Sequence, residues 1–311
     1  MFSSIWSDIK REFEYGNTLT RVIIVNVVVF LLVNAIMISF YLFNRGNVPY
    51  FFYQMLHSFS LGKSWEHNLY HPWVIFTHMF LHQGFFHLLW NMLYLYWFGH
   101  IVGDLVGNHR VFPIYILGGL AGGLVFFLTA NYFPNLGEFA LGASAAVMAV
   151  AMTAGVIAPD YIIRLVIFGE IKLKYIVAVL LLLDLIGVAT TTNSGGHFAH
   201  IGGALMGYFY AKMLQSGRDL ALPINRAIDA VADLGSIFHK GKRKVKRPGP
   251  RLAYRNKSMA GTQSSRQDSS GRQVSGHTEQ ERLDQILDKI KMSGYDSLSN
   301  EEKSFLNKMS S

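Results

Sequence analysis

Residues 195–207 read GGHFAHIGGALMG, and this stretch decides the fold. Gly203 and Gly207 are four residues apart, so on a helix they lie on one face, which Ala211 extends. A face of small residues lets a second helix approach closely, and such faces favour helix packing inside membranes. The expected partner is the alanine-rich segment LGASAAVMAV at residues 141–150. This contact would bring Ser144 and His200 within hydrogen-bond reach.

Six apolar segments approach or exceed the roughly 20 residues that a helix needs to cross a bilayer. They cover about residues 19–43, 85–102, 111–132, 141–158, 175–189 and 197–214. The chain is also 51% hydrophobic and only 15% charged, whereas soluble domains carry about 25% charged residues. We therefore expect an all-α membrane protein in which residues 19–214 form a bundle of six transmembrane helices.

Lysine and arginine residues mark one side of the predicted bundle. They occur before the first helix, between the second and third, and between the fourth and fifth, whereas residues 131–138 and 190–196 contain none. The first loop, residues 44–84, departs from this pattern with Arg45 and Lys63. Because cytoplasmic loops are enriched in these residues, both termini are expected in the cytoplasm. The absence of cysteine fits a bacterial plasma membrane.

The segments outside the bundle are a cytoplasmic N-terminal segment at 1–18, a basic linker at 215–277 and a small helical hairpin at 278–311. Of the 28 lysine and arginine residues, 19 lie from Lys212 onward. The run KGKRKVKR at 240–247 predicts attraction to anionic lipid and no nucleic-acid binding. Residues 220–238 have the pattern of an amphipathic helix, and 248–276 have the composition of a disordered linker. Ser299 and Glu302 predict a capping box.

Three clusters of polar residues interrupt the apolar segments, where such groups are costly and are therefore functional candidates. His87 and Asn91 project from the same face of the second helix. Ser144 starts the fourth helix, close to free backbone N–H groups that can bind negative charge. His200 starts the sixth helix. Together they supply a nucleophile, a general base and oxyanion donors, and because no acid accompanies them we predict a serine–histidine dyad.

At these residues the chain resembles the rhomboid family of intramembrane serine proteases, over about residues 20–214. The family's HxxxN element is found at His87 to Asn91, its G-x-S-G motif at residues 142–145 and its AHxxG element at 199–203. Ala145 takes the place of the second motif glycine. The resemblance implies that Ser144 is the nucleophile, His200 the base, and His87 and Asn91 oxyanion partners. It also implies cleavage of transmembrane protein substrates in a lipid bilayer without a cofactor.

Other interpretations of the polar residues compete with this one. His78 and His82 have the HxxxH spacing of zinc enzymes, but the glutamate that follows the first histidine in such sites is absent, so no metal is predicted. For Asp184 a structural hydrogen bond is expected, and His197 is expected to face a loop or pack. The alternative function is a catalytically silent rhomboid-like protein that binds membrane proteins or controls their quality, which Ala145 favours. A transporter is less well supported, because no internal repeat is evident.

Overall fold

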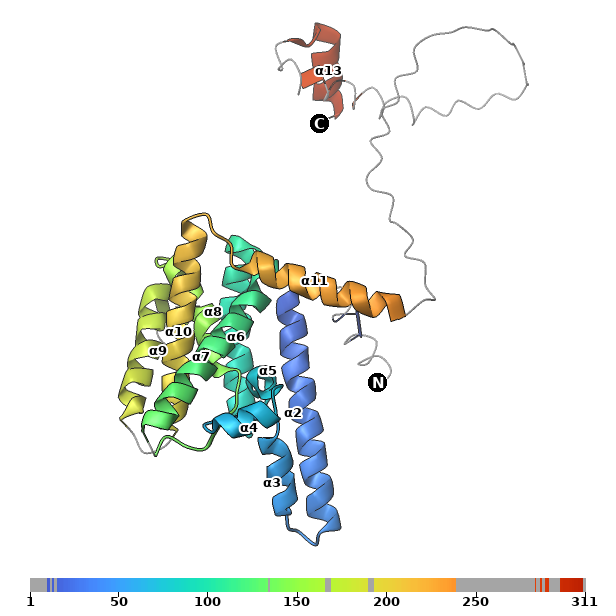
Figure 1. Ribbon diagram of the computed structural model, residues 1–311. Coiled ribbons are helices and arrows are strands. Elements are labelled where there is room, and N and C mark those ends of the chain that lie inside the picture. Colours follow the sequence, from blue (N-terminus) through green and yellow to red (C-terminus); the bar gives the residue numbers. More distant parts are fainter. Residues whose placement is uncertain are drawn as a thin grey trace, which may run out of the picture. The chain divides into compact units, whose positions relative to one another are not determined.

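The computed structural model divides the chain into two units, residues 1–243 and 244–311 (Figure 1). It describes residues 16–133, 135–165, 169–189, 193–238 and 297–309, together with isolated positions between 10 and 13 and between 283 and 290. The two units are taken separately below.

The first unit is mostly helical, and each of the six predicted segments contains one helix. These helices are α2 (Thr18–Phe43), α6 (Phe85–Val106), α7 (Val111–Tyr132), α8 (Ser144–Ile157), α9 (Leu173–Val188) and α10 (Ser194–Gln215), and α11 (Ala221–Phe238) follows them. By length and apolar composition, two helical stretches among the described residues suffice to cross a membrane, namely α2 and Asn108–Tyr132. The others are shorter or less apolar, so length and composition alone do not establish six crossings.

Helix α8 lies at the centre of the unit, in contact with α6, α7, α9 and α10. The predicted contact between α8 and α10 is present. A Cβ added to Gly203 would lie 2.0 Å from the carbonyl oxygen of Ala145, and one added to Gly207 would lie 2.2 Å from that of Ala149. The two backbones therefore touch, as a face of small residues allows.

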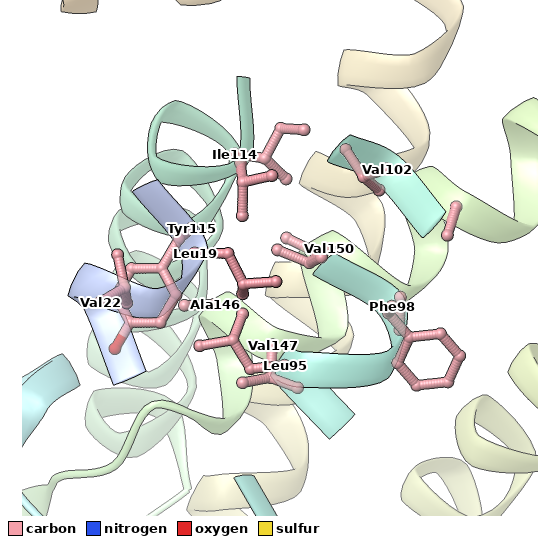
Figure 2. Packing of buried hydrophobic residues seen from close by; sticks show 14 of the residues in the cluster. Leu19, Val22, Leu95, Phe98, Val102, Ile114, Tyr115, Ala146, Val147 and Val150 are labelled. Atoms are coloured by element: carbon pink, nitrogen blue, oxygen red, sulfur yellow. The ribbon is translucent and has the colours of Figure 1, made fainter. Parts of the chain in front are cut away.

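The hydrophobic core fills the space between α2, α6, α7 and α8, where Leu95, Ala146 and Val150 are buried (Figure 2). A polar connection runs through it. The buried Asn26 amide of α2 donates a 3.2 Å hydrogen bond to the Tyr115 hydroxyl, which donates a 2.6 Å bond to the carbonyl of Met79. These hydrogen bonds connect α2, α7 and the end of the first loop inside the core.

The first loop, residues 44–84, is folded into short helices: α3 (Tyr50–His57), α4 (Trp65–Tyr70), α5 (Val74–Thr77) and the 3-10 helix η1 (His78–Phe80). It also contains a feature that the sequence did not indicate. Strand β1 (Leu61–Gly62) pairs antiparallel with β2 (Phe139–Ala140), which lies just before α8. This pairing holds the loop against the segment that leads into α8. A second antiparallel hairpin, β3 (Ile162–Leu165) and β4 (Gly169–Lys172), connects α8 to α9.

In the second unit, α13 (Asn300–Met309) begins with the predicted capping box. The backbone N–H of Ser299 donates to the Glu302 carboxylate at 2.7 Å, and that of Glu302 to the Ser299 hydroxyl at 3.3 Å. Lys289 pairs with Glu302 at 2.8 Å, and Ile286 is buried. The basic run 240–247 and the linker 248–276 lie outside the described residues.

Candidate active site

Ser144 is the first residue of α8, as the sequence predicted. The turn that precedes it depends on Gly142, whose φ of +130° is rarely adopted by residues with a side chain. The N–H of Gly142 donates a 2.9 Å hydrogen bond to the carbonyl of His78, which anchors the turn to the end of the first loop. The hydroxyl of Ser144 is therefore presented by a fixed backbone next to the unpaired N–H groups of a helix N-terminus.

His200 lies on the first turns of α10 and faces Ser144. Its Nε2 atom is 2.6 Å from the Ser144 hydroxyl oxygen, although the two residues are 56 positions apart in the sequence. The contact follows from the close approach of α8 and α10 at Gly203, one turn further along α10. The structure thus brings together the predicted nucleophile and base.

An acid accompanies this pair, contrary to the sequence-based expectation. Asp184, on α9, has Oδ1 at 2.7 Å from His200 Nδ1 and at 2.8 Å from His197 Nδ1. The expectation failed because the carboxylate and its partners are on different helices, so no local spacing joins them. The expected structural hydrogen bond of Asp184 exists, but it is made to the candidate base. His197, expected to face a loop or pack, shares the same carboxylate oxygen.

A pattern in the sequence could have indicated this cluster. His197 and His200 are three residues apart, so they lie on one side of a helix, and Asp184 is an acid within an apolar segment. Two histidines on one helix face can donate hydrogen bonds to one buried carboxylate that is nearby in the chain, and each group then has a partner. Among the described residues, these three side chains also form the group that could hold a metal ion, because their ligand atoms all lie within 4.8 Å of one another.

The predicted oxyanion residues are placed differently from each other. The His87 ring lies against the turn before Ser144, because a Cβ added to Gly142 would be 2.8 Å from its Nε2 atom. Asn91 is 6% exposed, and its amide donates a 2.7 Å hydrogen bond to the backbone carbonyl of His87. His87 therefore lies beside the turn before Ser144, and Asn91, one turn further along α6, lines a cavity together with Ser144 and His200.

His78 and His82 each make their own contacts with the backbone in this structure. His78 Nδ1 is 2.8 Å from the carbonyl of Val74, within its own helical turn. His82 is buried, with Nε2 at 3.4 Å from the backbone N of Ala143, and its Nδ1 has no hydrogen-bond partner among the described residues. Both histidines contact the backbone around the turn before Ser144, which agrees with scaffold roles.

Two cavities reach Ser144 and His200. The larger, about 990 Å³, lies beneath the first loop and is also lined by His87 and by His57, His67 and His71 of that loop. The smaller, about 390 Å³, is lined by α6, α8 and α9 and includes Trp90, Met148 and Asp184; we call it the α6–α9 cavity. A chain segment in either cavity would lie next to the serine hydroxyl.

Comparison with known proteins finds families that match two parts of the chain. Residues 70–217 match the Rhomboid domain family, and residues 275–311 match a family of unknown function, DUF6576. The chain is 32% identical over 139 residues to "Rhomboid protein 1, mitochondrial" of Saccharomyces cerevisiae, covering 42% of this chain and 38% of the relative. It is 29% identical over 137 residues to "Presenilin-associated rhomboid-like protein A, mitochondrial" of Danio rerio, covering 42% and 34%.

The chain thus spans less than two fifths of the length of either relative. The matched region includes α6 to α10, and with them Ser144, His200 and Asp184. Residues 70–217, just under half of the chain, therefore match the Rhomboid domain family, and this match indicates an integral, multi-pass membrane protein.

Proposed function

We propose that the protein is an intramembrane serine endopeptidase that hydrolyses peptide bonds in or near transmembrane segments of other membrane proteins. The observation that carries this proposal is the 2.6 Å contact between the Ser144 hydroxyl and His200 Nε2. A serine becomes a nucleophile when an adjacent base takes its proton, and a neutral histidine is suited to that near pH 7. The two cavities supply room for a substrate segment beside this pair.

The hydrogen bonds of His200 define which nitrogen acts as the base. An ionised carboxylate only accepts hydrogen bonds, so the 2.7 Å contact with Asp184 places the imidazole proton on Nδ1. Nε2 is then free to accept the hydrogen bond of the Ser144 hydroxyl. Asp184 acts as a positioning residue, because it contacts His200 and also stabilises the imidazolium that forms when Ser144 loses its proton.

The reaction proceeds in two stages. Ser144 attacks the scissile carbonyl while His200 takes its proton, and His200 then gives this proton to the leaving amine. Water, deprotonated by the same histidine, hydrolyses the acyl-enzyme and restores Ser144. The oxyanion of each tetrahedral intermediate is stabilised by the His87 side chain and by N–H groups at the start of α8. Asn91, on the same helix face as His87, is the second proposed oxyanion partner, and it lines the α6–α9 cavity together with Ser144 and His200.

We further propose that α2, α6, α7, α8, α9 and α10 all cross the bilayer, with both chain termini in the cytoplasm. The six helices lie in the six apolar segments, and the distribution of lysine and arginine supports this orientation. Helices α8 and α9, with 14 and 16 residues, are short for a crossing, which places their ends below the headgroups. The composition fits a bacterial plasma membrane, whereas both relatives are named as mitochondrial proteins.

The alternative, a catalytically silent binder, drew its support from Ala145. In the structure the methyl group of Ala145 faces α7, where a Cβ added to Gly122 would lie 2.4 Å from it. The glycine at 122 therefore provides the space that the alanine at 145 occupies. Because Gly122 leaves room for the methyl group, this substitution favours the silent binder less than the sequence alone suggested.

The proposal is tested by cleavage of a single-span model substrate with purified full-length protein. We expect Ser144→Ala and His200→Ala to lower the rate by at least about 10³-fold, because each removes one half of the nucleophile–base unit. Ser39→Ala, which removes an exposed hydroxyl of α2 outside both cavities, serves as the matched control and retains the wild-type rate. EDTA does not lower the rate of the wild type.

Two results would contradict the proposal. Cleavage that persists in Ser144→Ala would show that another group is the nucleophile. Folded wild-type protein that neither cleaves the substrate nor reacts with a fluorophosphonate probe would support the silent binder instead.

A further inference from the structure

We propose that Asp184, His197 and His200 form an inhibitory Zn²⁺ site, in which the metal takes the place of the hydrogen bonds that the carboxylate now accepts from the two imidazoles. We call these three residues the His–Asp cluster. The site itself does not depend on the proposed protease function, whereas its inhibitory consequence rests on that function. This cluster contains neither His78 nor His82, the two histidines with the HxxxH spacing.

The donor atoms of the His–Asp cluster have the identity and spacing of a zinc site. Two imidazole nitrogens and one carboxylate oxygen lie within 4.8 Å of one another, and three such ligands with an open fourth position are typical of zinc. Zinc bonds of about 2.0–2.2 Å in a tetrahedral arrangement separate ligand atoms by roughly 3.4 Å. The present separations from Asp184 are 2.8 and 2.7 Å, so the side chains need to move outward by less than about 1 Å.

Electrostatics favour a cation at this position. The Asp184 side chain is only 9% exposed, and within the described residues its ion-pair partners are His197 and His200, with no lysine or arginine. When both histidines are neutral, the cluster carries one buried negative charge. A buried carboxylate that is compensated only by neutral donors is stabilised further by a divalent cation.

The cluster is accessible and its geometry is supported by the backbone. Asp184 and His200 both line the α6–α9 cavity, and His200 also lines the large cavity. The His197 ring lies against Gly187 of α9, since a Cβ added there would be 2.4 Å from its Nε2 atom. The absence of a side chain at Gly187 lets the ring turn its Nδ1 toward Asp184.

Zinc binding would change the proton on the candidate base. A neutral histidine that coordinates through Nδ1 carries its proton on Nε2. The proton of His200 therefore moves from Nδ1 to Nε2, the atom that now accepts a hydrogen bond from Ser144. In that state Nε2 donates to the Ser144 hydroxyl and cannot take its proton, so the serine is not activated.

Binding is measured first in Ser144→Ala protein, with Co²⁺ as a spectroscopic probe and Zn²⁺ as its competitor. We expect one Co²⁺ with the intense visible absorption of four-coordinate cobalt, displaced by Zn²⁺, and a zinc-dependent rise in unfolding temperature. Adding His197→Asn, which keeps an amide donor near the Nδ1 position, should weaken metal binding at least 10-fold, since even outer-sphere partners of a metal contribute about 10–100-fold in affinity. His71→Asn, a first-loop histidine, is the matched control and keeps the signal.

A second variant retains all three ligands. Gly187→Ala should displace the His197 ring and weaken Co²⁺ binding in the same Ser144→Ala background. If His71→Asn abolishes the signal while His197→Asn and Gly187→Ala leave it intact, or if no Co²⁺ binds, the proposed site is wrong.

The consequence is measured in protein with an intact Ser144. Zinc should lower the cleavage rate at least 10-fold with recovery in EDTA, and His197→Asn, normalised to its own zinc-free rate, should need at least 10-fold more zinc. Metal binding without zinc inhibition of an active protease would overturn the inhibitory role. Metal binding by a protein that cleaves nothing would instead overturn the proposed protease function and leave the site standing.

Discussion

Helices α8 and α9 both contribute to the site, yet they are held in the protein in different ways. Ala149, Val150 and Ala151 of α8 are at most 1% exposed, because helices cover α8 on all sides. On α9, by contrast, a run of large apolar residues is 54–59% exposed: Leu182, Leu183, Leu185 and Ile186. The comparison shows that the nucleophile comes from the most enclosed helix and the positioning acid from a peripheral one. Close packing therefore fixes Ser144, whereas hydrogen bonds connect α9 to the site.

The largest effect is expected at the close contact that holds α8. Gly203→Val would place side-chain atoms where the Ala145 carbonyl lies, 2.0 Å from a Cβ at that position. The helices would separate, with a cost of about 3 kcal/mol, at the upper end for overpacked sites. Thermal unfolding and cleavage together measure this, and both should be severely reduced.

Gly84→Ala is the matched control for that substitution, because its added Cβ meets nothing within 4 Å. It should unfold like the wild type. Wild-type stability and activity in Gly203→Val would show that the α8–α10 contact does not hold the site.

The second effect tests what α9 contributes. Asp184→Asn keeps the shape of the side chain but presents an amide that can donate to His200 Nδ1, which favours the tautomer with the proton on Nε2. We expect kcat to fall on the order of 10²–10⁴-fold with little change in KM, because Asp184 acts through its hydrogen bond to the base.

Steady-state kinetics on folded protein separate these two parameters. Leu185→Ala, on the exposed side of the same helix, is the control and should leave both near their wild-type values. A rise in KM with unchanged kcat in Asp184→Asn would mean that this residue shapes the cavity and does not position His200.

The third effect compares apolar truncations on the two helices. Val150→Ala in α8 leaves a cavity in a fully enclosed position and should lower the free energy of unfolding by about 1–3 kcal/mol. Leu185→Ala in α9 should change it by less than about 0.5 kcal/mol, because the side chain faces outward. Unfolding of both variants in the same detergent measures the difference. Equal losses would show that α9 is covered by contacts beyond those of the described residues.

The smallest effect concerns the connection between the two helices. Hydrogen bonds from Lys174 and from Lys172 hold the pKa of Asp160 below its ordinary value. A carboxyl group with a lowered folded-state pKa stabilises the protein above the unfolded-state pKa, and this contribution is lost as the pH falls through the folded-state value. Asp160→Asn should therefore reduce stability slightly at neutral pH, and this difference should shrink as the pH falls from about 4 through the folded-state pKa.

Unfolding curves of the wild type and Asp160→Asn at several pH values test this prediction. Glu170→Gln, which removes the partner of Arg164 in the β3–β4 hairpin, is the control for a general effect of losing a loop carboxylate. A difference between Asp160→Asn and the wild type that grows as the pH falls would have the wrong sign.

Much of the fold could be predicted from the sequence, because the signals are local. Apolar segments indicated six helices, the glycines at 203 and 207 indicated the α8–α10 contact, and Ser299 with Glu302 indicated the capping box. Each of these signals consists of residues that are close to one another in the sequence. The pairing of β1 with β2 was not predicted, because two-residue strands separated by 76 positions leave no periodic pattern.

The candidate site was predictable to the extent that it depends on that helix contact. Ser144 and His200 were placed together because the small residues that bring their helices together lie one turn away from each. The acid was not predicted, since the position of Asp184 relative to His200 depends on the rotation of α9, and the sequence of α9 is apolar on nearly every side.

The sequence by itself determined the helical segments, the helix face that allows close approach, and the presence of a serine, a histidine and their motif neighbours. The tertiary structure decided which polar groups meet: Asp184 with both His197 and His200, and the first loop with the segment before α8. The reason is physical. Helix formation and small-residue packing depend on neighbours in the chain, whereas a hydrogen bond between helices depends on distances of a few tenths of an ångström that only the packed bundle sets.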